Sequence, residues 1–198
     1  PDYIDPMFHS RVIGAKARNL DLHFFSENTL RCLLAQNAAD RDVSVIEGVM
    51  GYYDGAGLTS EKASSYEVAQ VSRTPVVLVV NARGAALSLL PVIQGFLHFR
   101  ASSGIRGVIL NQCTAMTYAS LSAAIEERFG IRCFGFLPRL DECVLESRHL
   151  GLITPQEMAD LKEKLNALAD NLEKSLDIEG ILSLAASAEP LGYEVPEL

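Results

Sequence analysis

Three short runs of apolar, mostly β-branched residues set the strongest limit on how this chain can fold. They cover residues 43–46, 75–80 and 107–110, and a weaker run covers 133–137. Nearly continuous apolar runs of this length are typical of strands buried on both faces of a parallel sheet. Apolar residues at helical spacing occupy the segments between them, at 29–39, 63–71, 86–99 and 118–129. The alternation predicts βαβ units and an α/β fold with a mostly parallel sheet flanked by helices.

The last third of the sequence has a different pattern. Residues 155–172 predict a charged amphipathic helix, with Thr154 as its N-cap and Pro155 at its first position. A last short helix is predicted at 178–186. We therefore expect one domain over residues 1–188, followed by a linker at 189–198 that leads toward a further domain.

Composition narrows the class of partner. The 198 residues carry a net charge of -8, and the pI is near 5.0, which argues against a nucleic-acid-binding protein. No apolar run reaches the roughly 18 residues that cross a membrane, and no signal peptide opens the chain. The four cysteines form no CxxC pair, so we expect reduced thiols in a cytoplasmic protein.

Candidate functional residues follow the predicted strands. In open α/β sheets ligands bind beyond the carboxyl ends of the strands, and polar and glycine residues follow all four runs. Glu47 directly follows the first run, where a carboxylate can hold Mg²⁺ directly or through water. A solvated strand-end carboxylate is the alternative. The nearby glycines and Asp54 favour the functional interpretation, because glycine lets a backbone approach a ligand closely.

Two further segments each have a functional and a structural interpretation. Asn111 ends the third run, where its amide suits either an adenine edge or the cap of the next helix. The opening segment 1–6 holds Asp2 and Asp5 between two prolines that restrict the backbone. Residue pattern alone favours a disordered terminus for this segment. The histidines show no metal-ligand spacing, so we expect structural or exposed side chains.

The sequence contains no phosphate-binding loop of the form G-x-x-x-x-G-K-[ST]. None of its lysines follows a glycine; they are Lys16, Lys62, Lys162, Lys164 and Lys174. The chain also begins at Pro1 rather than at methionine, which we interpret as the loss of upstream residues.

Four segments in order resemble the cobyrinic acid a,c-diamide synthases, across residues 1 to about 186. They are Pro1-Asp2-Tyr3-Ile4-Asp5-Pro6, Asn19-Leu20-Asp21, Glu47-Gly48-Val49-Met50-Gly51 with Asp54-Gly55, and Arg148-His149-Leu150-Gly151-Leu152. The resemblance implies a phosphate-loop fold like that of dethiobiotin synthetase, whose first strand and loop are absent here. It also implies a glutamine amidotransferase domain beyond the linker.

The resemblance implies amidation of the c and then the a carboxylate of a corrin ring, with ATP, Mg²⁺ and glutamine-derived ammonia. By position, Asp2, Asp5, Glu47 and Asp54 match family acids near the metal, the phosphates and the reacting carboxylate, with Glu47 and Asp5 assigned to the metal. Tyr3 and Ile4 match corrinoid-handling positions, and Asn111 matches the adenine-binding asparagine. The chain departs from the family at Gln112, where arginine is expected.

Three functions remain open from the sequence. The first is a corrinoid a,c-diamide synthase fragment that is inactive by itself. The second is a related synthase for another tetrapyrrole, hydrogenobyrinic acid or nickel-sirohydrochlorin. The third is a non-catalytic nucleotide- or tetrapyrrole-binding module. A missing first strand would also leave exposed strand edges, which favour a homo-oligomer.

Overall fold

The computed structural model describes residues 4–143 and 155–195. The expectations for Asp2, Tyr3, Thr154 and the segment 148–152 therefore lie outside the described residues. Ile4 is described by its backbone alone.

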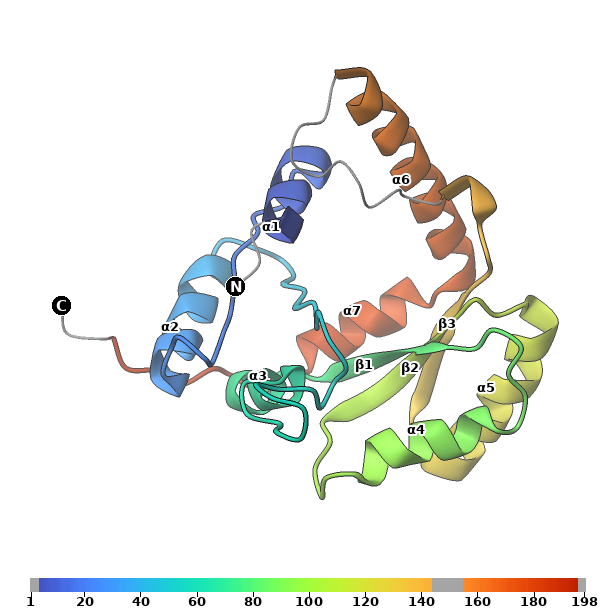
Figure 1. Cartoon of the computed structure of the whole chain (residues 1–198), viewed down its shortest axis with the longest axis horizontal. Coiled ribbons are helices and arrows are strands. Elements are labelled where there is room, and N and C mark those ends of the chain that lie inside the picture. Colours follow the sequence, from blue (N-terminus) through green and yellow to red (C-terminus); the bar gives the residue numbers. More distant parts are fainter. Residues whose placement is uncertain (1–3, 144–154, 196–198) are drawn as a thin grey trace.

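A parallel sheet forms the centre of the structure (Figure 1). Its strands are β1 (Val76–Asn81), β2 (Ile105–Asn111) and β3 (Arg132–Leu137), in the order β1-β2-β3. The helices α4 (Leu89–His98) and α5 (Ala115–Phe129) connect them. The predicted α/β architecture with a parallel sheet is confirmed, because a crossover helix joins β1 to β2 and another joins β2 to β3.

The main core lies between the sheet and these two crossover helices. Both connections join neighbouring strands in the same direction, so right-handed crossovers place both helices on one face, below the sheet in Figure 1. The fully buried side chains there include Ile93 of α4, Ile125 of α5, and Val108 and Leu110 of β2. Burying each of these contributes about 1.5–3 kcal/mol.

The opposite side of the sheet carries α6 (Pro155–Ser175) and α7 (Ile178–Ala186), above the strands in Figure 1. The junction between them covers the outer edge of β3, where Gly135 forms a bridge with Leu176. Gly135 has a φ of 125°, and a Cβ there would lie 2.7 Å from the Leu176 Cα, so the close approach requires glycine. No described helix is long and apolar enough to cross a membrane.

The outer edge of β1, unlike that of β3, is paired with no other described segment. Within the described residues β1 pairs only with β2, and the side chain of Val79 is 62% exposed. An apolar strand with one unpaired edge is the surface through which sheets associate.

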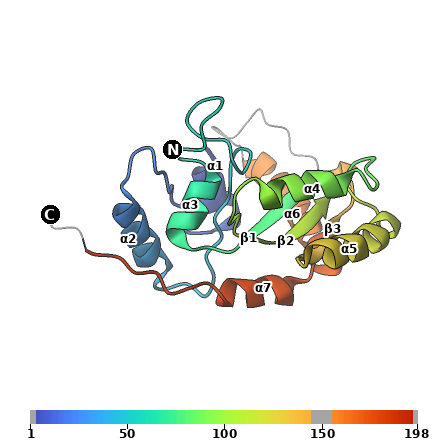
Figure 2. The same ribbon diagram turned by 90° about the horizontal axis from the view of Figure 1, so that it is seen from below.

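A second, smaller core lies at the β1 end of the sheet, where Figure 2 shows α2 (Glu27–Ala38) and α3 (Ser65–Ser72) side by side. Leu30 is completely buried there against Val68 and Val71. The chain before α2 forms α1 (Ile4–Phe8) and a π-helical turn, η1 (His9–Ile13), and a 3₁₀ turn, η2 (Asp141–Cys143), follows β3.

The predicted strand at 43–46 is wrong. These residues have no regular secondary structure, and Val45 is 88% exposed. A strand needs a hydrogen-bonded neighbour, whereas an apolar pattern records only a tendency toward burial. Ile46 alone packs against the smaller core. Glu47 therefore lies in an irregular segment rather than at the end of a strand.

The segment predicted as a linker is largely exposed and is hydrogen-bonded to the domain at Glu194. Asn28 of α2 donates through Nδ2 to the Glu194 carbonyl and accepts through Oδ1 from the Glu194 N–H, both at 2.8 Å. This two-bond contact joins residues 166 positions apart and carries the chain back to α2.

Candidate functional site

The carboxyl ends of the three strands lie level at one edge of the sheet. Asn81 pairs in register with Asn111, and Asn111 with Leu137. The Asn81 side chain accepts a hydrogen bond from the Arg83 N–H at 3.0 Å. Polar side chains therefore end β1 and β2 at this edge, and Arg139 follows β3 two residues after its end.

Asn111 ends β2 as predicted. Its Oδ1 accepts from the backbone N–H of Gln112 at 2.9 Å, and within the described residues its amide nitrogen makes no hydrogen bond. The cap of α5 is Thr114, whose hydroxyl accepts from the Thr117 N–H at 3.2 Å. The capping alternative for Asn111 is thus excluded, and adenine binding stays a prediction.

Asp54 closes a four-residue turn. Its backbone N–H donates to the Gly51 carbonyl at 2.9 Å, and its side chain is exposed. The two central residues, Tyr52 and Tyr53, point away from it into the structure. The Tyr52 hydroxyl donates to the carbonyl of Ser103, which precedes β2, at 2.6 Å.

This contact separates Asp54 from the polar edge. Ser103 lies at the amino end of β2, and the Tyr53 hydroxyl donates to the carbonyl of Phe96 near the end of α4 at 2.7 Å. The turn is therefore tied to the amino-terminal side of the sheet, whereas Asn111 lies at its carboxyl edge. The expectation that one edge gathers both residues depended on a strand at 43–46.

The glycines near Asp54 accommodate the chain itself. An added Cβ would lie 2.8 Å from the Ser65 hydroxyl at Gly48, and against the Asp54 carboxylate at Gly51. At Gly55 it would lie 2.6 Å from the carbonyl carbon of Glu61. The close approach that glycine was predicted to allow is real, but its partners in this structure are neighbouring protein atoms.

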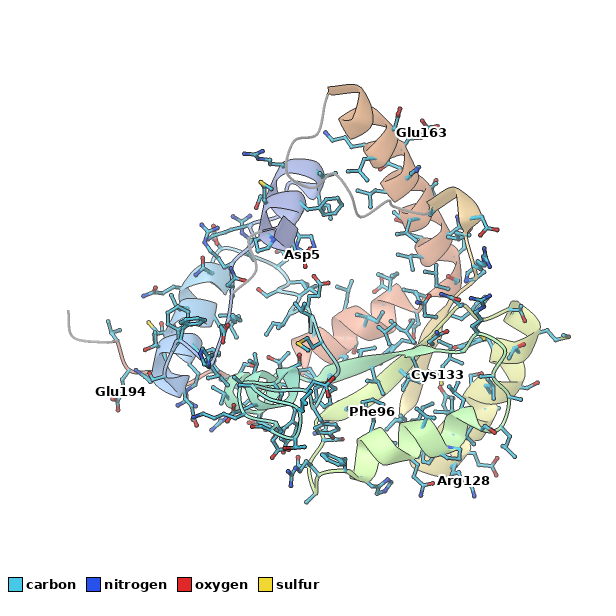
Figure 3. All side chains as sticks on the ribbon, in the orientation of Figure 1. Asp5, Phe96, Arg128, Cys133, Glu163 and Glu194 are labelled. Carbon is cyan, nitrogen blue, oxygen red and sulfur yellow. The ribbon has the colours of Figure 1, made fainter. Side chains whose placement is uncertain are left out.

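Glu47 contacts a residue that sequence reasoning set aside. The Nε2 atom of His9 lies 3.6 Å from Glu47 Oε2, with the two side chains 33% and 59% exposed. His9 follows Asp5 by four residues along α1 and η1, so the two lie one helical turn apart (Figure 3 labels Asp5). The opening helical segment and the Glu47 segment are thereby brought together. The four-residue spacing between Asp5 and His9 is the sequence signal that could have identified His9 as a candidate site residue.

The acids fit one kind of metal site. No group of three or more His, Cys, Asp or Glu side chains that could hold a metal occurs within 4–143 and 155–195. Mg²⁺ usually keeps several waters and binds through one or two carboxylates together with substrate phosphates. An exposed carboxylate such as Glu47 suits a site of this kind, and the described residues do not form an all-protein cage.

Comparison with known proteins adds the family. The model of a family described as an AAA domain matches residues 8–147. The cobyrinate a,c-diamide synthase of Caldanaerobacter subterraneus subsp. tengcongensis is 41% identical over 185 residues, which cover 93% of this chain and 41% of that protein. The same enzyme of Clostridium acetobutylicum is 39% identical over 184 residues, covering 92% and 41%. That of Thermoplasma acidophilum is 36% identical over 192 residues, covering 96% and 42%.

The chain therefore spans less than half the length of these relatives. No solved structure matches it.

Proposed function

This chain belongs to the AAA domain family, and we propose from that premise that it forms the ATP-dependent synthetase part of a cobyrinate a,c-diamide synthase. The full-length protein would amidate the a and c carboxylates of cobyrinic acid in cobalamin biosynthesis. The observation that carries this proposal is homology to such synthases over most of the chain. Membership of the AAA domain family supports nucleotide binding.

The proposed reaction solves one chemical problem, the poor reactivity of a carboxylate toward ammonia. A carboxylate oxygen attacks the γ-phosphorus of ATP, and ADP leaves, which gives an acyl phosphate. Ammonia then attacks the acyl carbon, phosphate leaves, and the nitrogen loses a proton to give the amide. The transferred phosphoryl group needs its charge neutralised and its position fixed, so electrostatic groups matter more than covalent ones.

The role proposed for each residue follows from the position that it matches in the synthase family. Asp2, Asp5 and Glu47 would lie near the phosphates and the reacting carboxylate. Asp54, whose turn is tied to the amino-terminal side of the sheet, would lie on the side of the reacting carboxylate, away from the adenine at Asn111. Tyr3 and Ile4 would contact the corrinoid. Asn111 would bind the adenine edge, which is supported by its place at the carboxyl edge of the sheet.

Glu47 and Asp5 would hold Mg²⁺, which when bound neutralises phosphate charge. His9, at 3.6 Å from Glu47, would keep that carboxylate directed toward η1 before the nucleotide arrives. Because Glu47 is largely exposed, its contact with His9 is weak, about 0–1 kcal/mol, and a bound ligand can displace it.

The remaining parts of the machinery would come from outside residues 1–198. We propose that residues 1–188 are a partial synthetase domain and that 189–198 lead to a glutamine amidotransferase domain that supplies ammonia. A phosphate loop with its lysine would precede Asp2. The 198-residue chain by itself is then inactive, and its open β1 edge supports pairing with a second copy. We expect the reaction to take place in the cytoplasm.

An amidation assay on the purified full-length protein tests the proposal. With ATP, Mg²⁺ and glutamine, cobyrinic acid should gain two amides, detected as stepwise mass changes. Hydrogenobyrinic acid and nickel-sirohydrochlorin serve as competing substrates under identical conditions. Faster amidation of either one would replace the corrinoid assignment, and no amidation of any of the three would reject the enzyme in favour of a binding module.

A further inference from the structure

The turn that carries Asp54 is held by two tyrosines, Tyr52 and Tyr53, which occupy its centre. Both hydroxyls donate to backbone carbonyls of other elements, Tyr52 to Ser103 at 2.6 Å and Tyr53 to Phe96 at 2.7 Å. The hydrogen bond to Ser103 is buried. A buried hydroxyl with a short, well-made hydrogen bond fixes a side chain more firmly than packing alone, because breaking the bond leaves a polar group unsatisfied.

The rings of these tyrosines are held as well. The Tyr53 ring lies 4.8 Å from that of Phe99 and 6.1 Å from that of Phe96, labelled on α4 in Figure 3. The Tyr52 and Tyr53 rings meet edge to face at 4.9 Å, and Tyr66 of α3 contacts both. Aromatic pairs at these distances add about 0.5–1.5 kcal/mol each beyond burial.

Backbone contacts also hold the turn in place. Together with the hydrogen bonds and ring contacts of Tyr52 and Tyr53, they form the anchor of the Asp54 turn. The Tyr66 N–H donates to the Tyr52 carbonyl at 2.9 Å, so the turn is joined to the first residues of α3. Burial raises the pKa of both Tyr52 and Tyr53, which keeps their hydroxyls protonated as hydrogen-bond donors. Three elements, α3, α4 and the start of β2, therefore hold a turn that lies between irregular segments.

Asp54 receives its position from this anchor. Its N–H is bonded to the Gly51 carbonyl, and its carboxylate lies over the Gly51 Cα, where a side chain would collide with it. Among the described residues, the exposed carboxylate makes no hydrogen bond or ion pair comparable with the contacts of the two tyrosines. Its place relative to the rest of the domain is set by the two residues that precede it.

We propose that Tyr52 and Tyr53 are positioning residues for the Asp54 carboxylate in the amidation reaction. The proposal rests on the proposed function, in which Asp54 lies near the reacting groups. Neither tyrosine touches the reacting atoms; both act through the turn. A phenylalanine at either position keeps the ring and removes only the hydroxyl that ties the turn down.

Hydrogen exchange in the full-length protein tests the anchor without reference to catalysis. Tyr52→Phe and Tyr53→Phe should each speed exchange of the Asp54 N–H about threefold to tenfold, the effect of one lost hydrogen bond. Tyr118→Phe is the matched control, because its hydroxyl donates to the Cys133 carbonyl at 3.1 Å in a different part of the core. Exchange at Asp54 that stays at the wild-type rate in both variants overturns the proposal.

Amidation kinetics test the consequence for function. The two variants should lower kcat by a factor of about ten with little change in the KM for ATP, because the substrate still binds while the carboxylate is misplaced. Tyr118→Phe should turn over at the wild-type rate. A fall in kcat that is equal in this control reduces the two tyrosines to a structural role and overturns the proposal.

A double variant separates this inference from the proposed function. If Tyr53 acts only through Asp54, then adding Tyr53→Phe to Asp54→Asn should cause no further loss of turnover. A further tenfold loss, or wild-type turnover in Asp54→Asn alone, overturns the inference while amidation itself persists. If the wild-type protein amidates no tetrapyrrole, the proposed function fails and the positioning assignment fails with it, whatever the exchange data show.

Discussion

Replacing Gly51 by alanine should impair the reaction and leave the fold intact. A Cβ at this position would lie 2.9 Å from the Asp54 Cγ and closer still to its Oδ2, whereas ordinary contact begins at 3.4 Å. The Asp54 Cγ must therefore move by about 0.5 Å, and Oδ2 must move further. The neighbour is the end of an exposed side chain, which can rotate away. Gly51 does not have a positive φ, so alanine fits its backbone, and reduced unfolded-state entropy adds about 0.4–1 kcal/mol of stability.

The net change in the free energy of unfolding should therefore stay within about 1 kcal/mol. Turnover should fall roughly tenfold, since displacing a reacting group by about 1 Å costs up to about a hundredfold. Gly55→Ala is the comparison, because its Cβ would lie 2.6 Å from the Glu61 carbonyl carbon and 2.7 Å from the Ser60 carbonyl oxygen. Backbone atoms cannot rotate away, so this variant should lose about 1–3 kcal/mol.

Thermal unfolding and amidation kinetics on the two full-length variants measure the contrast. The expected pattern is a melting temperature near wild type with low kcat for Gly51→Ala, and a lowered melting temperature for Gly55→Ala. Wild-type turnover in Gly51→Ala would refute the link between this glycine and Asp54. Equal destabilisation of the two variants would refute the steric reasoning.

Further predictions concern the sheet edge, the C-terminal segment and the thiols. The 198-residue chain should self-associate through β1, which analytical ultracentrifugation would detect. Val79→Lys should give a monomer at nearly unchanged stability, because this residue is 62% exposed. A monomeric wild-type chain would contradict this prediction. Asn28→Ala removes both hydrogen bonds to Glu194, so amide exchange over 188–195 should rise while the melting temperature hardly changes. Unchanged exchange would show that these two hydrogen bonds do not hold the segment. Burial raises the pKa of Cys133 to about 12, so at pH 8 a thiol reagent should modify Cys143 first and Cys133 only on unfolding; early labelling of Cys133 would refute its burial.

The sheet and its crossover helices were predictable from the sequence because each signal was local and repeated. The runs at 75–80 and 107–110 fall within one or two residues of β1 and β2, and the helix predicted at 178–186 coincides with α7. The segment 43–46 carries the same kind of signal and fails. Its strand would need a neighbour that the described residues do not provide, and composition cannot register the absence of a partner.

The candidate site, like the fold, could be predicted from the sequence only in part. Asn111 could be placed at the carboxyl edge because it directly follows an apolar run that does form a strand. The tertiary contacts of Tyr52 and Tyr53 could not be foreseen, since their hydroxyls bond to carbonyls 51 and 43 residues away, respectively. The approach of His9 to Glu47 is likewise a contact between segments that only the folded chain brings together.

Glu47 is the most important residue of the proposed reaction, because its carboxylate is assigned to Mg²⁺ and the phosphates. The decisive measurement is ATP-dependent amidation of cobyrinic acid by the full-length protein carrying Glu47→Gln, beside Glu27→Gln, an exposed acid that pairs with Arg31 on α2. The side chain of glutamine has the same shape but no charge, so the account predicts a loss of turnover of at least about a hundredfold for Glu47→Gln, with normal melting. Glu27→Gln should retain wild-type turnover. Near-wild-type amidation by Glu47→Gln would contradict the account and remove this carboxylate from the reaction.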